Sequence, residues 1–250
     1  MFNLATSCDK CCFCDMDGNT QVGCSIGMLK NFEDAGATIT DREDNGTTTK
    51  VIDRVCMYRR HTNSKFEDVA SEIFPKASFV IIHKLGESED KLEQSINSIK
   101  EMKFISLSKP KIVICHEENF SKMIAFSKNE DFSFANVHIV CMIEKLYTDH
   151  MYDEAFKRCS NGYVFFLNSG QEVSEDKLVK LNIAINILML RVLSVTGDVE
   201  CHMATMYKYL KGNREKTINQ KVEDMNKLFP SKTSYTWEEI DDKVASYLKR

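Results

Sequence analysis

The sequence lacks the excess of positive charge that general nucleic-acid binding needs. Its 250 residues hold 33 Lys and Arg against 37 Asp and Glu, a net charge of −4, and the pI is near 5.9. Without a broad basic field, the surface has no general attraction for phosphate backbones. We therefore expect no nucleic-acid partner.

The sequence also lacks a segment suited to entering or crossing a membrane. The first residues carry neither the basic start nor the apolar stretch of a signal peptide. The longest apolar run, LNIAINILMLRVLSV, is short and is interrupted by Asn182, Asn186 and Arg191. We expect a cytoplasmic location and no membrane partner.

Cysteine, by contrast, is abundant, with ten residues. Disulfides are not expected, because the sequence shows no export signal and the chain exceeds the small domains that need such cross-links. Reduced thiols or metal ligands are favoured instead. Four cysteines fall in apolar segments and are expected to be buried as small hydrophobic residues: Cys115, Cys141, Cys159 and Cys201.

The chain divides by composition into three parts. Residues 1–60 are rich in Cys, Gly, Asp, Asn and Thr, and Asn45-Gly46 marks a turn between polar flanks. Residues 61–77 form a charged connector, in which FEDVASEIF predicts a short amphipathic helix that ends at Pro75. Residues 78–250 form the main domain, and no internal repeat or low-complexity tract interrupts them.

The main domain alternates apolar runs typical of strands with amphipathic segments typical of helices. Strands are expected at 78–83, 111–115, 136–143 and 162–167. Helices are expected at 88–102, 118–128, 152–160, 174–190, 202–210, 216–229 and 236–249. This alternation implies crossover connections, so we predict an α/β fold with a mainly parallel sheet covered on both faces.

Three segments of the main domain resemble the nucleotide-sugar half of family-two glycosyltransferases, which have the GT-A fold. They are SFVIIHKLGESEDKLEQSINSI, PKIVICHEEN and DEAFKRCSNGYVFFLNSGQEVSEDKL. The resemblance covers about residues 78–190 and continues toward 229. It implies a GT-A type sheet with a helical C-terminal part.

The resemblance also identifies positions where the family's chemistry is changed. The family ends a strand with Asp-x-Asp, whose carboxylates hold a divalent cation against the diphosphate. Here those positions read Asn168-Ser169-Gly170, so no strong Mg²⁺ or Mn²⁺ site is expected. The family's acidic pair after its second strand corresponds to Glu117-Glu118, which makes Glu117, Glu118, Asn168 and Gly170 the candidate nucleotide-binding residues.

Two functions are compatible with this pattern. The favoured one is a non-catalytic scaffold that keeps the fold of a glycosyltransferase without its enzymology. The alternative is an active, metal-independent glycosyltransferase, with Glu117, Glu118 or Glu172 in place of the aspartates. Its general base would be Asp224 of the Glu223-Asp224 pair, although such a pair on an amphipathic helix is usually its solvated face. Basic residues would then replace the cation: Lys208, Lys211 or Arg214.

The N-terminal cysteines suggest a metal site. Cys8, Cys11 and Cys14 follow the spacing C-x2-C-x2-C, which lets three thiolates converge on one ion or cluster. Cys24 and Cys56 compete for the fourth place, and Cys12 is the expected spare. The spacing is more typical of an iron-sulfur cluster than of zinc, and both remain open, as do six metal-free thiols. A metal or redox sensor is a further alternative.

The N-terminal part carries a second resemblance. CDKCCFC, Cys24 and the segment DRVCMYRR ahead of SFVIIH are similar to the baseplate hub assembly proteins of T-even-type tailed bacteriophages. This resemblance implies a role in virion assembly in the host cytoplasm. The partners would then be other proteins, namely baseplate hub components.

Overall fold

A computed structural model provides the structure of the chain. It describes residues 5–9, 11–56, 76–102, 110–116, 120–129, 131–141, 155, 156, 158, 159, 162–204, 220, 224, 227 and 232–249. The chain forms two compact units. The first comprises Met1–Phe74, Glu175–Met189 and Glu238–Arg250, and the second comprises Pro75–Ser174 and Leu190–Trp237.

The first unit is built around a small sheet. Its strands are β1 (Thr6–Ser7), β2 (Cys14–Asp17), β3 (Thr20–Cys24), β4 (Ile39–Asp44) and β5 (Thr47–Ile52). Within the described residues they are ordered β1-β5-β3-β2, and β4 pairs with β5. Asn45 and Gly46 both have positive φ, as a tight hairpin turn requires, so the predicted turn is confirmed between β4 and β5.

Helices complete the first unit from three separate parts of the chain. They are α1 (Met28–Asp34), α6 (Glu175–Asn182) with the π-helix η2 (Ile183–Ile187), and α9 (Trp237–Leu248). The Arg54 guanidinium donates hydrogen bonds to the carbonyl oxygens of Gly36 and Leu248. Lys180 Nζ lies 2.8 Å from Asp176 and 3.1 Å from Asp241. The bond between Arg54 and Leu248 therefore joins residues 194 positions apart in the chain.

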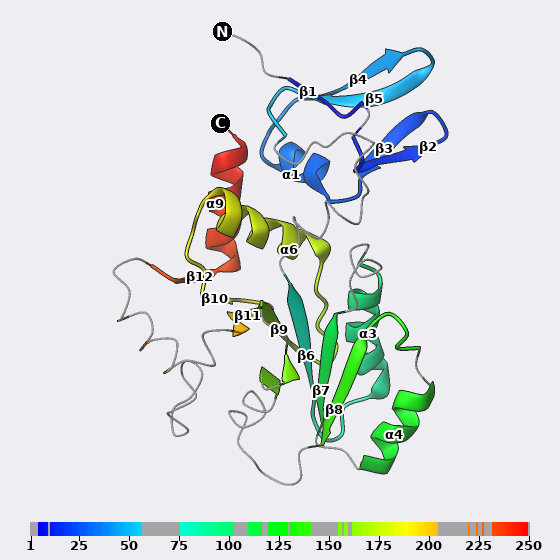
Figure 1. Ribbon diagram of the computed structural model, residues 1–250, viewed down its shortest axis with the longest axis vertical. Helices are drawn as coiled ribbons and strands as arrows, with labels where there is room; N and C mark the ends of the chain where they lie inside the picture. Colours follow the sequence, from blue (N-terminus) through cyan, green and yellow to red (C-terminus); the bar gives the residue numbers. More distant parts are fainter. Residues whose placement is uncertain are drawn as a thin grey trace. The chain divides into compact units, whose positions relative to one another are not determined.

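The second unit contains a seven-stranded mixed sheet among its described residues, in the order β12-β10-β11-β9-β6-β7-β8. β9, β6, β7 and β8 pair in parallel, whereas β11 is antiparallel to both β9 and β10. Figure 1 shows these central strands side by side, with α3 (Glu89–Lys100) next to them. The remaining bounds are β6 (Ala77–His83), β7 (Lys111–His116), α4 (Phe120–Asn129), β8 (Asn136–Cys141), β9 (Tyr163–Asn168), β10 (Ser194–Thr196), β11 (Glu200–Met203) and β12 (Ser234–Thr236).

The mixed α/β class is confirmed, and the reason lies in local sequence. β6 and β7 are apolar on both faces and buried almost throughout, as strands covered on both sides must be. α3 begins with Glu89 and Asp90, whose charges favour a helix N-terminus, and buries Leu92, Ile96 and Ile99 on one face.

The C-terminal half of the sequence departs from the predicted elements. The helix expected at 174–190 is α6 followed by η2, and the chain leaves it at Met189 with a positive φ of 54°. The helix expected from His202 is wrong for its first two residues, because His202 and Met203 belong to β11. Within the described residues, no helix is long and apolar enough to cross a membrane.

An aromatic group forms part of the core of the second unit. The rings of Phe79 and Phe165 have centroids 5.6 Å apart, and Trp237 lies 6.3 Å from Phe165. The Trp237 indole donates a 2.6 Å hydrogen bond to the carbonyl of Val199. Cys115, Cys159 and Cys201 are buried, as expected for small hydrophobic residues, and the side chain of Cys141 lies outside what the structure describes.

Gly162, which precedes β9, tests the close approach of its backbone to Lys76, which precedes β6. Its φ is +130°, and an added Cβ would lie 2.1 Å from the Lys76 carbonyl oxygen. We expect Gly162→Ala to lower the free energy of unfolding by at least about 3 kcal/mol, because backbone strain and a backbone clash act together. Urea unfolding followed by circular dichroism measures this loss.

Gly86→Ala is the matched control. Gly86 also has a positive φ, +83°, but no atom lies within 4 Å of an added Cβ. Only the conformational cost of about 1–2 kcal/mol is expected there. A loss in Gly162→Ala no larger than that of Gly86→Ala would contradict the predicted clash.

Candidate functional site

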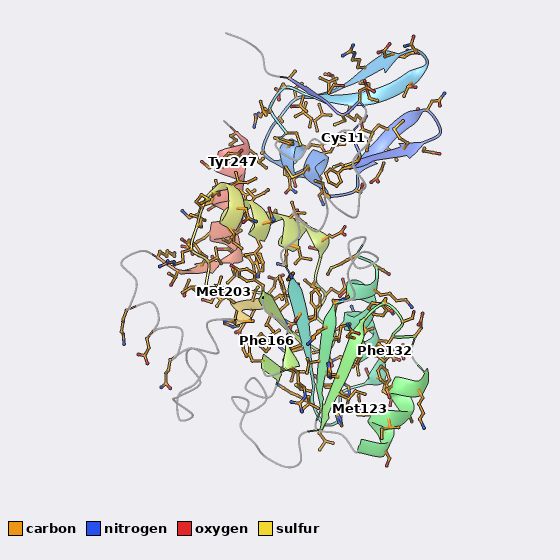
Figure 2. All side chains as sticks on the ribbon, in the orientation of Figure 1. Cys11, Met123, Phe132, Phe166, Met203 and Tyr247 are labelled. Atoms are coloured by element: carbon orange, nitrogen blue, oxygen red, sulfur yellow. The ribbon has the colours of Figure 1, made fainter. Side chains whose placement is uncertain are left out.

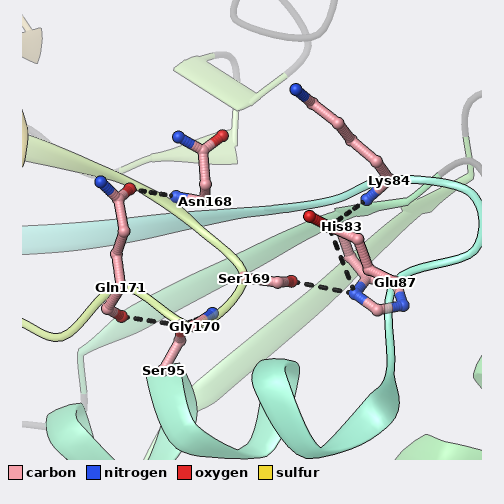
Figure 3. A network of polar contacts seen from close by, with 8 residues as sticks. All are labelled: His83, Lys84, Glu87, Ser95, Asn168, Ser169, Gly170 and Gln171. Atoms are coloured by element: carbon pink, nitrogen blue, oxygen red, sulfur yellow. Dashed lines mark hydrogen bonds and ion pairs between the residues drawn. The ribbon is translucent and has the colours of Figure 1, made fainter.

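The carboxyl ends of β6 and β9 meet at one edge of the parallel part of the sheet. Ile82 pairs with Asn168, so the next residues, His83 and Ser169, lie level with each other. His83 Nδ1 and Ser169 Oγ are joined by a 2.9 Å hydrogen bond, and both side chains are buried. Figure 3 shows this pair at the centre of a polar network. This is the edge where parallel sheets commonly bind ligands.

The loop after β9 is fixed to α3 by the hydroxyl of Ser95. Ser95 Oγ accepts the Gly170 N–H at 3.0 Å and donates to the Gln171 carbonyl at 2.7 Å. The Gly170 N–H also donates to the Lys91 carbonyl at 2.9 Å. Gly170 has a φ of +90°, a conformation that favours glycine. Its backbone is therefore turned toward α3.

The side chain of Gln171 closes the same loop. Its Oε1 accepts the Asn168 N–H at 2.6 Å, and its Nε2 donates to the Asp198 carbonyl at 2.6 Å. The next side chain, Glu172, accepts a 2.8 Å hydrogen bond from Gln94. The side chains of Gln171 and Glu172 thus bond within the fold, whereas Asn168 is bonded through its backbone and is exposed.

Glu87 is an acidic residue beside the His83–Ser169 pair. Its Oε2 accepts the Lys84 N–H at 2.7 Å and lies 3.9 Å from His83 Nδ1. A Mg²⁺ or Mn²⁺ ion needs several oxygen ligands in nearly octahedral arrangement. Throughout the described part of the chain, no group of three or more His, Cys, Asp or Glu side chains is arranged to hold a metal ion.

The remaining predicted catalytic and nucleotide-binding residues are only partly described. Asp224 lies 3.5 Å from Lys227 Nζ at helical spacing, in an ion pair whose lysine is largely exposed. Such a pair is typical of a solvated helix face. Glu117, Glu118 and Glu223 lie outside the described residues, as do three basic candidates: Lys208, Lys211 and Arg214.

A second candidate site is a pocket of the first unit in which five of the six N-terminal cysteines meet. The pocket holds about 340 Å³ of empty space, including the part open to solvent. Its cysteines are Cys8, Cys11, Cys14, Cys24 and Cys56, and Cys12 does not line it. Figure 2 labels Cys11 in this part of the chain. All five cysteines that the sequence predicts as metal ligands therefore line the same pocket.

Three tight turns position these cysteines. The Cys11 N–H donates to the Cys8 carbonyl at 3.0 Å, and the Cys14 N–H donates to the Cys11 carbonyl at 3.1 Å. Each x2 step therefore reverses the chain, as the spacing predicts. After Cys24, Gly27 donates to the Cys24 carbonyl at 2.8 Å and adopts a φ of +71°.

The electrostatics of the thiols show that four of them lie close to one another. Burial first, and then the neighbouring Cys8, Cys11 and Cys24, raise the pKa of Cys14 to about 12. The pKa of Cys24 is raised to about 11, chiefly by burial, although backbone N–H groups of Ile26 and Met28 donate to it and lower it. These thiols stay protonated at neutral pH unless a cation offsets the charge.

Cys56 occupies a different environment on the pocket wall. Its backbone N–H donates to Thr6 Oγ1 at 2.9 Å. Its thiol contributes to raising the pKa of Tyr247 on α9, after the larger effect of burial.

The donor set of the pocket fits a thiophilic metal. Four thiols lie within electrostatic reach of one another, and the rest of the lining is mainly apolar, with Phe13, Ile26 and Ile52 among it. Zinc and iron-sulfur clusters both take four cysteine thiolates in such surroundings. Among the described residues the thiols are not arranged as metal ligands, so metal binding would require their sulfur atoms to move closer together.

Comparisons with known proteins identify no family. No protein-family model matches the chain, and no curated protein matches it either. Among solved structures, the mannosyltransferase PcManGT of Pyrobaculum calidifontis is 16% identical, with a TM-score of 0.41 over 55% of this chain and 47% of that one. The residue 1–349 fragment of S. aureus TarS is 14% identical, with a TM-score of 0.44 over 68% and 64%.

A third solved structure is 4-diphosphocytidyl-2C-methyl-D-erythritol synthase from Anaerococcus prevotii. It is 14% identical, with a TM-score of 0.40 over 70% of this chain and 97% of that one. The chain thus spans about half the length of PcManGT and under two thirds of the TarS fragment. Nucleotide-sugar glycosyltransferases are among the structures that resemble it, and at these scores the likeness carries no argument about activity.

Sequence reasoning missed the residues that organise the carboxyl edge. His83 closes β6, and Ser95 lies on the buried face of α3 between Leu92 and Ile96. Their signal was present, because a polar residue at the end of an apolar strand or within an apolar helix face needs a hydrogen-bond partner. The identity of those partners depends on strand pairing over more than seventy residues.

Ser95 tests whether the loop after β9 depends on α3. Ser95→Ala removes one donor and one acceptor and leaves the Gln171 carbonyl without this partner. We expect a loss of about 1–3 kcal/mol in the free energy of unfolding, measured in urea. Ser127→Ala is the control, because Ser127 Oγ only donates to the Ile124 carbonyl of its own helix. Equal effects of the two substitutions would refute the predicted role.

Proposed function

We propose that this chain is a non-catalytic assembly or interaction factor built on a glycosyltransferase-like scaffold. One observation carries the proposal. The loop at the position of the family's cation-binding carboxylates contains Asn168, Ser169 and Gly170, and its polar groups bond to α3, to Gln171 and to His83. None of these three residues is a carboxylate, so the loop lacks the groups that would hold a divalent cation against a diphosphate.

The proposal includes a structural metal in the first unit. Five cysteines line one pocket, and the chain around them has few apolar residues with which to build a core. Coordination contributes directly to the folding of such a segment. Iron-sulfur and zinc are both compatible with the donor set, and the metal would serve the fold and not a reaction.

The partner class follows from the second sequence resemblance. The cysteine cluster and DRVCMYRR are similar to baseplate hub assembly proteins of T-even-type phages, so the proposed partners are hub proteins in the host cytoplasm. In the described part of this region, Val22 and Val55 are apolar yet largely exposed. Exposed apolar side chains of this kind are what a protein partner can cover.

The first test is binding of nucleotide sugars. Titration of UDP- and GDP-sugars into the full chain with Mn²⁺ is expected to give no heat above dilution, with a Kd weaker than about 1 mM. The same titration without Mn²⁺ examines the metal-independent alternative. A micromolar affinity that requires Mn²⁺ would sink the proposal.

Sugar transfer without a cation would instead support the alternative glycosyltransferase. In that case Asp224→Asn is expected to abolish turnover while circular dichroism stays unchanged, because the general base is lost. Lys227→Gln is the matched control, since it breaks the same ion pair and keeps the carboxylate. Unchanged turnover in Asp224→Asn would exclude that residue as the base.

The second test addresses assembly directly. Purified hub proteins of a T-even-type phage are mixed with and without the chain, and their association is followed by size-exclusion chromatography with light scattering. We expect the chain to increase the yield of hub complexes at substoichiometric amounts, as a factor that leaves the product would. Identical profiles with and without the chain would contradict the proposed partner class.

A further inference from the structure

We infer that Cys8, Cys11, Cys14 and Cys24 bind a single zinc ion, and that Cys56 lies outside the ligand set. The inference rests on the structural metal proposed above and deepens it, because it commits to the ion and to its four ligands.

The backbone supplies two arms that face one another. The first arm is the double turn in which Cys11 and Cys14 donate to the carbonyls of the preceding cysteines. The second is the turn after Cys24, which Gly27 closes with its positive φ. Ser25 joins the arms, because its N–H and its hydroxyl both donate to the Phe13 carbonyl, at 2.9 and 3.0 Å.

The strand register places one ligand of each arm directly opposite the other. Cys14 and Cys24 are partners in the antiparallel β2–β3 pair. Side chains opposite each other in such a pair have Cβ atoms about 4.5–5.5 Å apart. Two thiolates on one zinc ion are about 3.8 Å apart, from a Zn–S length of about 2.3 Å in a tetrahedron. The pairing therefore suits two sulfurs that share one ion.

An iron-sulfur cluster fits this pairing less well. In a four-iron cluster each thiolate binds a different iron, so the sulfurs stand further apart than those around one ion. The N–H groups of Ile26 and Met28 donate to the Cys24 sulfur, which stabilises a thiolate in either kind of centre. The direct strand pairing of Cys14 with Cys24 is what favours a compact tetrathiolate site.

Cys56 is excluded by its place in the fold. It follows β5, and its backbone is held by Thr6 on β1. It contributes to the pocket wall but belongs to neither arm, and its thiol lies near enough to Tyr247 on α9 to raise the pKa of that side chain. Cys12 does not line the pocket. The four remaining cysteines supply the number of ligands that a closed zinc site requires.

The experiment measures metal content in the full chain and in four variants, purified under reducing conditions in the presence of zinc and iron. We expect one zinc per chain, no iron and no absorption near ~400 nm. Cys14→Ser and Cys24→Ser are expected to weaken zinc binding at least tenfold in competition with a chromophoric chelator. Cys12→Ser and Cys56→Ser are expected to stay within twofold of the parent chain.

Cys24→His keeps the test decisive if the serine variants fail to fold. A Cys₃His set also binds zinc, so this variant is expected to retain the ion. Replacing zinc with cobalt(II) is then expected to give weaker thiolate charge-transfer absorption than in the parent chain. Cys56→His should leave the cobalt spectrum unchanged.

The outcomes separate the inference from the proposal on which it rests. An iron-bound brown protein overturns the inference and leaves a structural metal in place. Loss of zinc in Cys56→Ser but not in Cys24→Ser overturns the ligand set alone. A chain without any metal, or with a Cys14–Cys24 disulfide under the same conditions, overturns both the inference and the proposed structural metal. None of these results bears on nucleotide-sugar binding.

Discussion

The carboxyl edge of the second unit depends on hydrogen bonds from two buried side chains to the loop after β9. Ser95 accepts the Gly170 N–H and donates to the Gln171 carbonyl, and His83 Nδ1 is joined to Ser169 Oγ. Once these partners are taken, the loop after β9 is fixed on α3. The edge at which parallel sheets commonly hold ligands is here part of the framework, and the proposed non-catalytic role follows from that use.

The cysteine pocket of the first unit differs from this hydrogen-bonded edge. Its thiols are half-buried, and the pKa values of Cys14 and Cys24 are raised, so a cation bound there would stabilise their thiolates. Apolar neighbours such as Phe13 and Ile52 strengthen this effect, because they exclude water from the sulfur atoms. The two units therefore differ: the loop after β9 is held by hydrogen bonds to neighbouring residues, whereas the first unit gathers five cysteine thiols around one pocket.

The sequence predicts most of what local pattern controls. β6, β7, β9 and α3 lie within a residue or two of the expected bounds, since apolar runs and a 3.6-residue period are strong signals. β10, β11 and β12 were missed because strands of three or four residues carry little periodicity. Their existence depends on pairing with β9 and with one another, which local pattern does not encode.

The candidate sites likewise combine features that local sequence predicts with features that depend on long-range contacts. The turns at Cys8, Cys11 and Cys14 follow from spacing, and the changed residues at 168–170 follow from the resemblance. The choice between Cys24 and Cys56 needed the register of β2 with β3, and the role of Ser95 needed the packing of α3 against a loop 75 residues away. Both are long-range facts that no window of the sequence contains.

The discontinuous first unit has a consequence for biosynthesis. Its sheet precedes α6 and α9 in the chain, and these helices are translated only after most of the second unit has been made. The carbonyl of Leu248, which Arg54 binds, is made 194 residues after Arg54 itself. The thiols at positions 8–24 are therefore made well before their unit can close, a period in which chaperones and oxidants can reach them.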